Sequence, residues 1–358
     1  MRLPLKPPID PMLALLVKEI PEGPDWQYEM KVDGFRAIVF WDGKELFIQS
    51  RDLKPLNRYF PELENGLKKV LPPGIVVDGE IVIEGPKGLD FDALLLRIHP
   101  AASRVQKLAK ETPASFIAFD LLAAKGKNLM NEPLKKRRNE LEKLLARSAA
   151  PVYIAPATAE AQTARKWFTR FEGAGLDGIV AKRLNEPYLP GERAMMKIKH
   201  QRTIDCVVGG FRWNKGEKHI AVGSLLLGLY QGRILHYVGH ASNFTKPQRR
   251  ELVELLSKYR DADESKGFGK GRTPGGISRW SQGKDTSWEP LRPELVCEIS
   301  FDHLQGDRFR HAATFKRWRF DKPPRQCTFD QIKSPKPFAF QKVVAPASTP
   351  AKKASSTS

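Results

Sequence analysis

The sequence predicts an α+β chain of two domains, the first built from antiparallel sheets with helices and the second a small β-barrel. Its length of 358 residues suits two domains that each bury a core. The first two hundred residues alternate β-branched runs with amphipathic helical segments. From Thr203 onward the chain consists mostly of short apolar runs, joined by turn signals such as Asn214-Lys215-Gly216 and Gln231-Gly232.

We place the first domain at residues 1–202, the second at 203–333 and a tail at 334–358. The tail is rich in Pro, Ala, Lys and Ser without periodicity, so we expect it to be basic and disordered. No stretch has the character of a signal peptide or a membrane span. Cys206, Cys297 and Cys327 are too widely spaced to indicate a disulfide framework or a zinc site. We therefore expect a protein of the reducing cytoplasm.

Basic residues exceed acidic residues along the chain. The sequence holds 60 Lys and Arg against 41 Asp and Glu, a formal net charge of +19. Such an excess favours a polyanionic partner such as nucleic acid. A generally basic, soluble surface is the alternative, since charge alone does not identify a partner.

The chain is organised around the stretch 31–36, Lys-Val-Asp-Gly-Phe-Arg. Apolar residues at alternate upstream positions predict a strand whose other face carries Lys31. We expect Asp33-Gly34 to turn a hairpin that returns 35–41 as a second strand. A lysine at such a strand end acts as a nucleophile if its neighbours lower its pKa enough to expose the free amine. The alternative is a polar strand face, because six-residue patterns often match by chance.

Further charged residues fall within predicted strands. Asp78-Gly79-Glu80 interrupts the β-branched run 75–83, which indicates either carboxylates that face a site or a solvent-exposed edge. Lys197 and Lys199 share one face of the strand 194–199, where two ammonium groups repel unless an anion lies between them. Asp120 lies in the strand 115–122, and the pattern allows it to be buried or exposed.

Amphipathic spacing predicts several helices in both domains. They lie at 59–71, 91–98, 159–171 and 247–259, with another that starts at Pro133. The helix after Pro133 carries Lys135, Lys136, Arg137 and Arg138 on one face. A basic run of this kind usually faces solvent, and the alternative is that it contacts phosphate groups.

The second domain is predicted to contain strands at 205–212, 220–230, 233–239 and 295–304, with a long loop at 261–286. Its length, short strands and basic loops suit an OB-fold, whose open face commonly binds nucleic acid. Its tryptophans at 213, 280, 288 and 318 could stack on bases, although packing within the domain is the more ordinary role.

Taken in order, these motifs resemble those of ATP-dependent DNA ligases. The resemblance covers about residues 1–330 and rests on the segments 31–36, 50–51, 78–80, 116–121, 177–182, 196–199 and 310–323. The chain is similar to the small two-domain bacterial ligases related to the end-joining ligases. The resemblance implies a nucleotidyltransferase (adenylation) domain followed by an OB-fold domain. It also implies sealing of DNA nicks in repair through a lysyl-AMP intermediate.

The resemblance implies a role for each matching residue. Lys31 would take AMP from ATP, while Arg310, Arg319, Asp321 and Lys322 would act on the outer phosphates and the leaving pyrophosphate. The nucleotide would be bound by Glu29, Arg36, Arg51, Glu80, Phe119, Lys197 and Lys199, and nearby cations are expected to lower the pKa of Lys31. Glu80 and Asp177 would bind Mg²⁺ or Mn²⁺, although many relatives carry Glu at the position of Asp177. The second domain would close over ATP about a hinge near Thr203.

The expected partners are nicked or broken duplex DNA and a Ku-like or other repair protein. We expect a monomer, associated with the nucleoid and with no membrane partner. An RNA ligase or an mRNA-capping guanylyltransferase would use the same lysine and is the nearest alternative. A catalytically silent DNA-binding module of a repair assembly is the alternative from another class. No glycine-rich P-loop is present in the sequence, so ordinary ATPase chemistry is not indicated.

Overall fold

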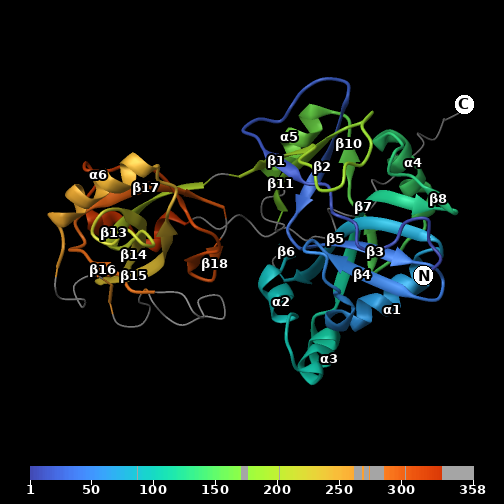
Figure 1. The fold of residues 1–358 in the computed structure, drawn as a ribbon, viewed down its shortest axis with the longest axis horizontal. Coiled ribbons are helices and arrows are strands. Elements are labelled where there is room, and N and C mark those ends of the chain that lie inside the picture. Colours follow the sequence, from blue (N-terminus) through green and yellow to red (C-terminus); the bar gives the residue numbers. More distant parts are fainter. Residues whose placement is uncertain are drawn as a thin grey trace, which may run out of the picture. The chain divides into compact units, whose positions relative to one another are not determined.

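The computed structural model describes residues 1–86, 88–170, 176–200, 202–261, 268–269, 274, 286–302 and 304–332. The fold divides into two compact units, Met1–Lys199 and His200–Ser334 (Figure 1). The predicted tail at 334–358 and most of the loop at 261–286 lie outside the described residues, as does Trp280. None of the described helices is long and apolar enough to cross a lipid bilayer.

The first unit contains two sheets. One has the strand order β1-β12-β11-β2-β10, and the other β4-β3-β5-β7-β8 with β6 beside β5 and β9 beside β7. Their strands are β1 (Ala14–Leu16), β2 (Trp26–Val32), β3 (Phe35–Trp41), β4 (Leu46–Ser50), β5 (Ile75–Gly85), β6 (Gly88–Leu89), β7 (Ala114–Ala124), β8 (Lys127–Asn128), β9 (Val152–Ile154), β10 (Ala157–Thr158), β11 (Leu176–Arg183) and β12 (Met195–Lys199). Only β1 with β12 and β7 with β9 run parallel among these pairs of described strands. The predicted antiparallel sheets are therefore confirmed.

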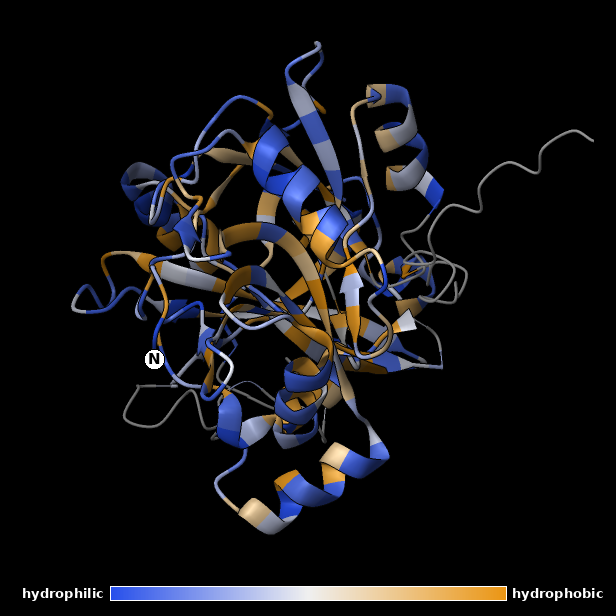
Figure 2. Cartoon of the chain, turned by 90° about the vertical axis from the view of Figure 1, so that its right-hand side faces the viewer, coloured by the Kyte–Doolittle hydropathy of each residue, from blue (hydrophilic) through white to orange (hydrophobic). Residues whose placement is uncertain are grey.

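The helices of the first unit each bury an apolar face, which for α3 packs against α1. They are α1 (Pro61–Val70), α2 (Phe91–Leu96), α3 (Ala102–Glu111), α4 (Leu134–Leu144) and α5 (Ala161–Arg170). Leu63 and Leu67 of α1 are fully buried in the core beneath the larger sheet. Helix α3, which buries only Val105 and Ala109, was not predicted from the sequence. Figure 2 shows the apolar residues gathered on the strands, with polar residues along the outer helix faces.

The predicted hairpin at Asp33-Gly34 is wrong. β2 pairs with β10 and β11 in one sheet, whereas β3 pairs with β4 and β5 in the other. Residues 33–34 thus carry the chain from one sheet to the other. Glycine is required there by close packing, since a Cβ at Gly34 would lie 2.2 Å from the backbone oxygen of Ile81. The Asp-Gly pair marks a place where the backbone packs closely, but β2 and β3 on either side of it do not pair with each other.

The solvated basic face expected on α4 is only half correct. Lys135 and Lys136 are exposed, but Arg137 and Arg138 are buried. Arg137 donates from Nε and Nη2 to the two carboxylate oxygens of Asp120, at 2.8 and 3.0 Å. Asp120 is therefore buried, which settles the alternative that the strand pattern left open. A buried guanidinium needs such a partner, because transfer of an unpaired charge from water is too costly.

The second unit is a curled antiparallel sheet of order β15-β14-β13-β17-β20, with β16 beside β13. Its elements are β13 (Arg202–Trp213), β14 (Val222–Gln231), β15 (Ile234–Ala241), α6 (Lys246–Ser257), β16 (Glu289–Pro290), β17 (Val296–Phe301), β18 (Leu304–Gln305), β19 (Arg308–Phe309) and β20 (Thr314–Trp318). The backbone N–H of Ala313 donates to the carbonyl of His240 at 2.8 Å, which links the two ends of the sheet. The predicted small barrel, with its helix near 247–259, is confirmed.

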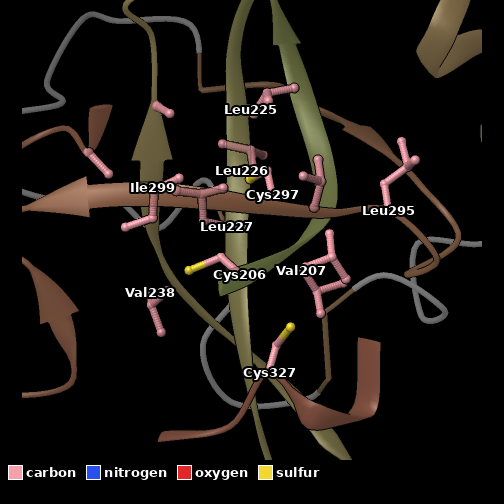
Figure 3. Packing of buried hydrophobic residues seen from close by; sticks show 14 of the residues in the cluster. Cys206, Val207, Leu225, Leu226, Leu227, Val238, Leu295, Cys297, Ile299 and Cys327 are labelled. Carbon is pink, nitrogen blue, oxygen red and sulfur yellow. The ribbon is translucent and has the colours of Figure 1, made fainter. Parts of the chain in front are cut away.

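The core of this barrel contains the three cysteines. Cys206 and Cys297 lie opposite each other on β13 and β17, and Cys327 approaches the same cluster of leucines and valines (Figure 3). All three are free thiols, and burial raises the pKa of each. They therefore behave as small apolar groups rather than nucleophiles.

Tryptophans 213, 288 and 318 pack partly buried against the same core. The indole N–H of Trp213 donates to Glu289 at 2.8 Å. Packing, rather than a free stacking surface, accounts for these three side chains.

Candidate active site

One cavity in the first unit collects most of the predicted nucleotide-binding residues. Its lining draws on β1, β2, β3, β5, β7, β11 and β12, and on the segment before β1. The predicted residues that line it are Glu29, Lys31, Arg36, Arg51, Glu80, Phe119 and Lys197. Asp177 and Lys199 join the site through direct contact with Lys31 or its partner. The long-range strand pairing thus brings together side chains that lie up to 170 positions apart in the sequence.

Lys31 is held by a carboxylate. Its Nζ lies 2.6 Å from Oδ2 of Asp177, and Nζ of Lys199 lies 2.8 Å from the same oxygen. Burial lowers the pKa of Lys31, but the attraction and hydrogen bond of Asp177 outweigh burial and raise it. The expected lowering of this pKa is therefore wrong for this arrangement, in which the amine is an ammonium at neutral pH.

The local backbone explains this contact. Gly178 of β11 lies opposite both Lys31 of β2 and Lys199 of β12, and the β2 register shifts between Leu176 and Gly178. Gly178 has φ +143°, and a Cβ there would lie 1.9 Å from the backbone oxygen of Ile198. Only glycine fits this irregularity, which sets Asp177 within reach of both lysines.

A second charged pair supports Arg36. Its Nε and Nη2 donate to Asp78 at 2.6 Å each, and its guanidinium carbon lies 4.5 Å from the ring centroid of Phe119. Asp78 is fully buried. The carboxylates of the 78–80 segment therefore divide their roles, because Asp78 holds Arg36 while Glu80 lines the cavity.

Glu29 is anchored by residues that the sequence analysis did not assign to the site. Its two oxygens accept from Nε2 of Gln27 and lie near Nζ of Lys182, each at 2.7 Å. Lys182 also lies 4.5 Å from the ring centroid of Phe119 and lines the cavity. Val180 and Lys182 lie two positions apart on β11 and both line the cavity, so the period of this strand was the available signal.

The described lining of the cavity carries more cationic than anionic side chains: Lys31, Arg36, Arg51, Lys182, Arg193 and Lys197 against Glu29 and Glu80. Burial and the neighbouring cations Lys199, Lys31 and Arg51 lower the pKa of Lys197. Burial raises the pKa of Glu80 to about 7, with Arg36 and Lys31 opposing that shift. Such a setting binds anions such as phosphate, and its carboxyl group titrates near neutral pH.

Three of the four residues predicted in the second unit, Arg319, Asp321 and Lys322, form a cluster around Asp205. Arg319 donates from Nη1 to both oxygens of Asp205, at 3.0 and 3.1 Å, and from Nε to Asp321 at 2.9 Å. Nζ of Lys322 lies 2.7 Å from Asp205. Arg310 is half-buried and belongs to the segment of chain that follows β19 and precedes β20. Asp205, which the sequence analysis did not single out, therefore organises two of the four predicted residues.

Comparison with known proteins agrees with this arrangement. Residues 11–199 match the model of the ATP dependent DNA ligase domain, and 218–322 match the ATP dependent DNA ligase C terminal region. DNA ligase C2 of Mycolicibacterium smegmatis is 48% identical over 346 residues, 94% of this chain and 97% of the relative. DNA ligase C of Mycobacterium tuberculosis is 46% identical over 358 residues, 96% of this chain and 99% of the relative.

A solved structure shows the same fold. A structure described as a structure–function analysis of Lig E DNA ligases, with DNA binding by a minimal scaffold, covers 86% of this chain and 99% of its own, with a TM-score of 0.53 and 17% identity. The first unit is a nucleotidyltransferase domain and the second an OB-fold domain. The chain therefore belongs to the ATP-dependent DNA ligases.

Proposed function

We propose that this chain seals nicks in duplex DNA in three phosphoryl transfers, with Lys31 as the residue that carries the adenylate. Nζ of Lys31 attacks the α-phosphorus of ATP, the bond to the β-phosphate oxygen breaks, and pyrophosphate leaves. The 5′-phosphate of the nick then displaces Lys31 from AMP. Finally the 3′-hydroxyl attacks that 5′-phosphorus, and AMP leaves as the strand is joined. The observation that carries this proposal is the position of Lys31 in an electropositive cavity of a ligase domain.

Lys31 must lose a proton before it attacks. Its ammonium is paired with Asp177 at 2.6 Å, so this carboxylate lies within reach to accept the proton. The proposed contacts are Arg36, Arg51, Lys197 and Lys199 with phosphate charge, Phe119 with adenine and Glu29 beside the base. These cations would stabilise the charge that develops on the phosphorus as the amine attacks.

We propose that Glu80 and Asp177 bind Mg²⁺, or Mn²⁺ in its place. Among the residues that the structure describes, no group of three or more His, Cys, Asp or Glu could hold a metal ion. Mg²⁺ commonly uses one or two carboxylates and completes its shell with phosphate oxygens and water, so Glu80 fits as one ligand. Asp177 fits less directly, because both Lys31 and Lys199 contact its Oδ2. When bound, the ion would neutralise charge on the triphosphate.

We propose that Arg310, Arg319, Asp321 and Lys322 act on the β- and γ-phosphates, with the OB-fold domain closing about residues near Thr203. This role requires Arg319 and Lys322 to exchange part of their contact with Asp205 for phosphate oxygens. Arg319→Ala should then slow self-adenylation but leave sealing of a nick that already carries AMP on its 5′-phosphate.

The substrate proposal is nicked or broken duplex DNA, in repair that includes end joining. Basic charge and membership in the DNA ligases support it. We propose a monomeric protein of the nucleoid that works with a Ku-like end-binding protein. Sealing of RNA nicks, or transfer of GMP from GTP, would instead favour an RNA ligase or a capping enzyme. Normal nick binding without adenylation would favour a silent repair module.

The direct test is covalent labelling. Incubation with ATP labelled at the α-phosphate should leave a heat-stable protein adduct in the wild type and none in Lys31→Ala. Lys54→Ala, at an exposed position, serves as the matched control and should label normally. An adduct of equal strength in Lys31→Ala would overturn the proposal.

A further inference from the structure

We infer that Tyr188 is a positioning residue for Arg36, an inference that rests on the proposed function of the cavity. Tyr188 lies between β11 and β12, is 2% exposed, and does not line the cavity among its described lining residues. Its hydroxyl nevertheless connects two residues that line the cavity, Met12 through its backbone and Arg36 through its guanidinium. It makes this connection through the buried carboxylate of Asp78.

The four groups form a closed circuit of hydrogen bonds. The N–H of Met12 donates to the Tyr188 hydroxyl oxygen at 2.9 Å, and that hydroxyl donates to Oδ2 of Asp78 at 2.7 Å. Arg36 donates to both oxygens of Asp78 at 2.6 Å, and its Nη2 reaches the carbonyl of Met12 at 3.4 Å. The circuit spans 176 positions of sequence between Met12 and Tyr188, so it exists only in the folded chain.

The direction of each bond in the circuit is fixed. A backbone N–H only donates, so the single proton of the Tyr188 hydroxyl is left for Asp78. Burial and the nearby Asp78 raise the pKa of Tyr188, so the hydroxyl keeps that proton throughout the working pH range. Asp78 thus accepts from Arg36 on both oxygens and from Tyr188 on one, which holds the guanidinium in a single orientation.

This orientation matters because two members of the circuit, Arg36 and Met12, line the cavity proposed to bind ATP. Arg36 lies over Phe119, and Met12 belongs to the segment 11–14 that lines the cavity. Loss of the hydroxyl would free the Asp78–Arg36 pair and the Met12 backbone together. We therefore expect Tyr188 to affect ATP binding without touching ATP.

Tyr188→Phe tests this role because it removes the hydroxyl and keeps the buried ring. Tyr28→Phe is the matched control, since Tyr28 is fully buried in the same domain and its hydroxyl donates to the carbonyl of Pro21 at 2.6 Å. For protein adenylation, Tyr188→Phe should raise the KM for ATP about tenfold with little change in kcat, and Tyr28→Phe should leave both unchanged. Equal KM values for the two variants would overturn the inference.

A double-mutant cycle separates positioning from loss of stability. In an Arg36→Lys background, Tyr188→Phe should add no further rise in KM, because the oriented guanidinium is already lost. A full additional tenfold rise would show that Tyr188 acts independently of Arg36 and would overturn the inference.

Calorimetric binding of ATP to Lys31→Ala protein, with and without Tyr188→Phe, gives the same comparison without covalent chemistry. Weaker binding in the double variant would support the positioning role even if Lys31 proves not to carry the adenylate. If Tyr188→Phe leaves the ATP affinity of Lys31→Ala protein unchanged, while wild-type protein is labelled at Lys31, then only the role of Tyr188 is overturned.

Discussion

Nζ of Lys31 lies 2.6 Å from Oδ2 of Asp177, an oxygen that Nζ of Lys199 also approaches at 2.8 Å. One buried carboxylate therefore balances two ammonium groups that would otherwise repel each other. The proposed nucleophile is held ionised in this arrangement, and the protein must transfer its proton before the attack on ATP. Control of this proton, as much as the presence of the lysine, is expected to set the pH dependence of adenylation.

The first prediction concerns Asp177→Asn. The amide cannot stabilise the Lys31 ammonium by charge, so the pKa of Lys31 should fall. In single turnovers, the limb of the pH–rate profile on which self-adenylation speeds up with rising pH should shift to lower pH by about one unit. The rate above that limb should also fall, because the amide cannot accept the Lys31 proton. Asp33→Asn is the control, because Asp33 contributes less than Asp177 to the raised pKa of Lys31. A limb that stays at the wild-type pH would contradict the role assigned to Asp177.

The second prediction concerns stability and Glu80. Burial raises its pKa from 4.5 to about 7, so between these values the folded protein binds more protons than the unfolded chain. This contribution to stability therefore decreases as pH rises through that window. Glu80→Gln removes this pH dependence. The free energy of unfolding of the variant, measured relative to wild type, should therefore rise by about 2 kcal/mol as the pH goes from 5 to 8. Urea unfolding at several pH values measures it.

The control for Glu80 is Glu84→Gln, at an exposed position of the same strand. A Glu80→Gln difference that does not change with pH, or that changes no more than the Glu84→Gln difference, would contradict the raised pKa of Glu80.

The third prediction concerns the buried pair of α4. Arg137→Ala should reduce the free energy of unfolding by about 3 to 5 kcal/mol, because the buried side chain of Asp120 would lose both hydrogen bonds from the guanidinium. Lys136→Ala, one position earlier and exposed, should change it by less than about 0.5 kcal/mol. Similar losses in the two variants, measured by urea unfolding, would mean that the pair contributes no more than a surface contact.

The fourth prediction concerns Gly178→Ala. The added methyl would lie 1.9 Å from the backbone oxygen of Ile198, so β11 and β12 must separate. We expect a loss of about 3 kcal/mol or more, and slower adenylation because Asp177 moves with β11. Gly126→Ala is the control, since Gly126 has φ +72° but open space around it, and should lose about 1 to 2 kcal/mol. Equal losses would assign the whole effect to backbone strain.

Apolar periodicity and motif order are local properties of the chain, so they predicted the longer strands, most of the helices, the order of the two domains and several residues of one site. Lys31, Glu80 and Lys197 were predicted in this way and line one cavity. Short strands such as β1, β6 and β10 were not predicted. Three features follow only from the tertiary structure. The strands β2 and β3 pair in different sheets, Arg137 is buried, and Tyr188 is connected to Arg36 through Asp78. These features depend on which distant strands pack together, and the free energy of that packing is shared among residues that no local pattern connects.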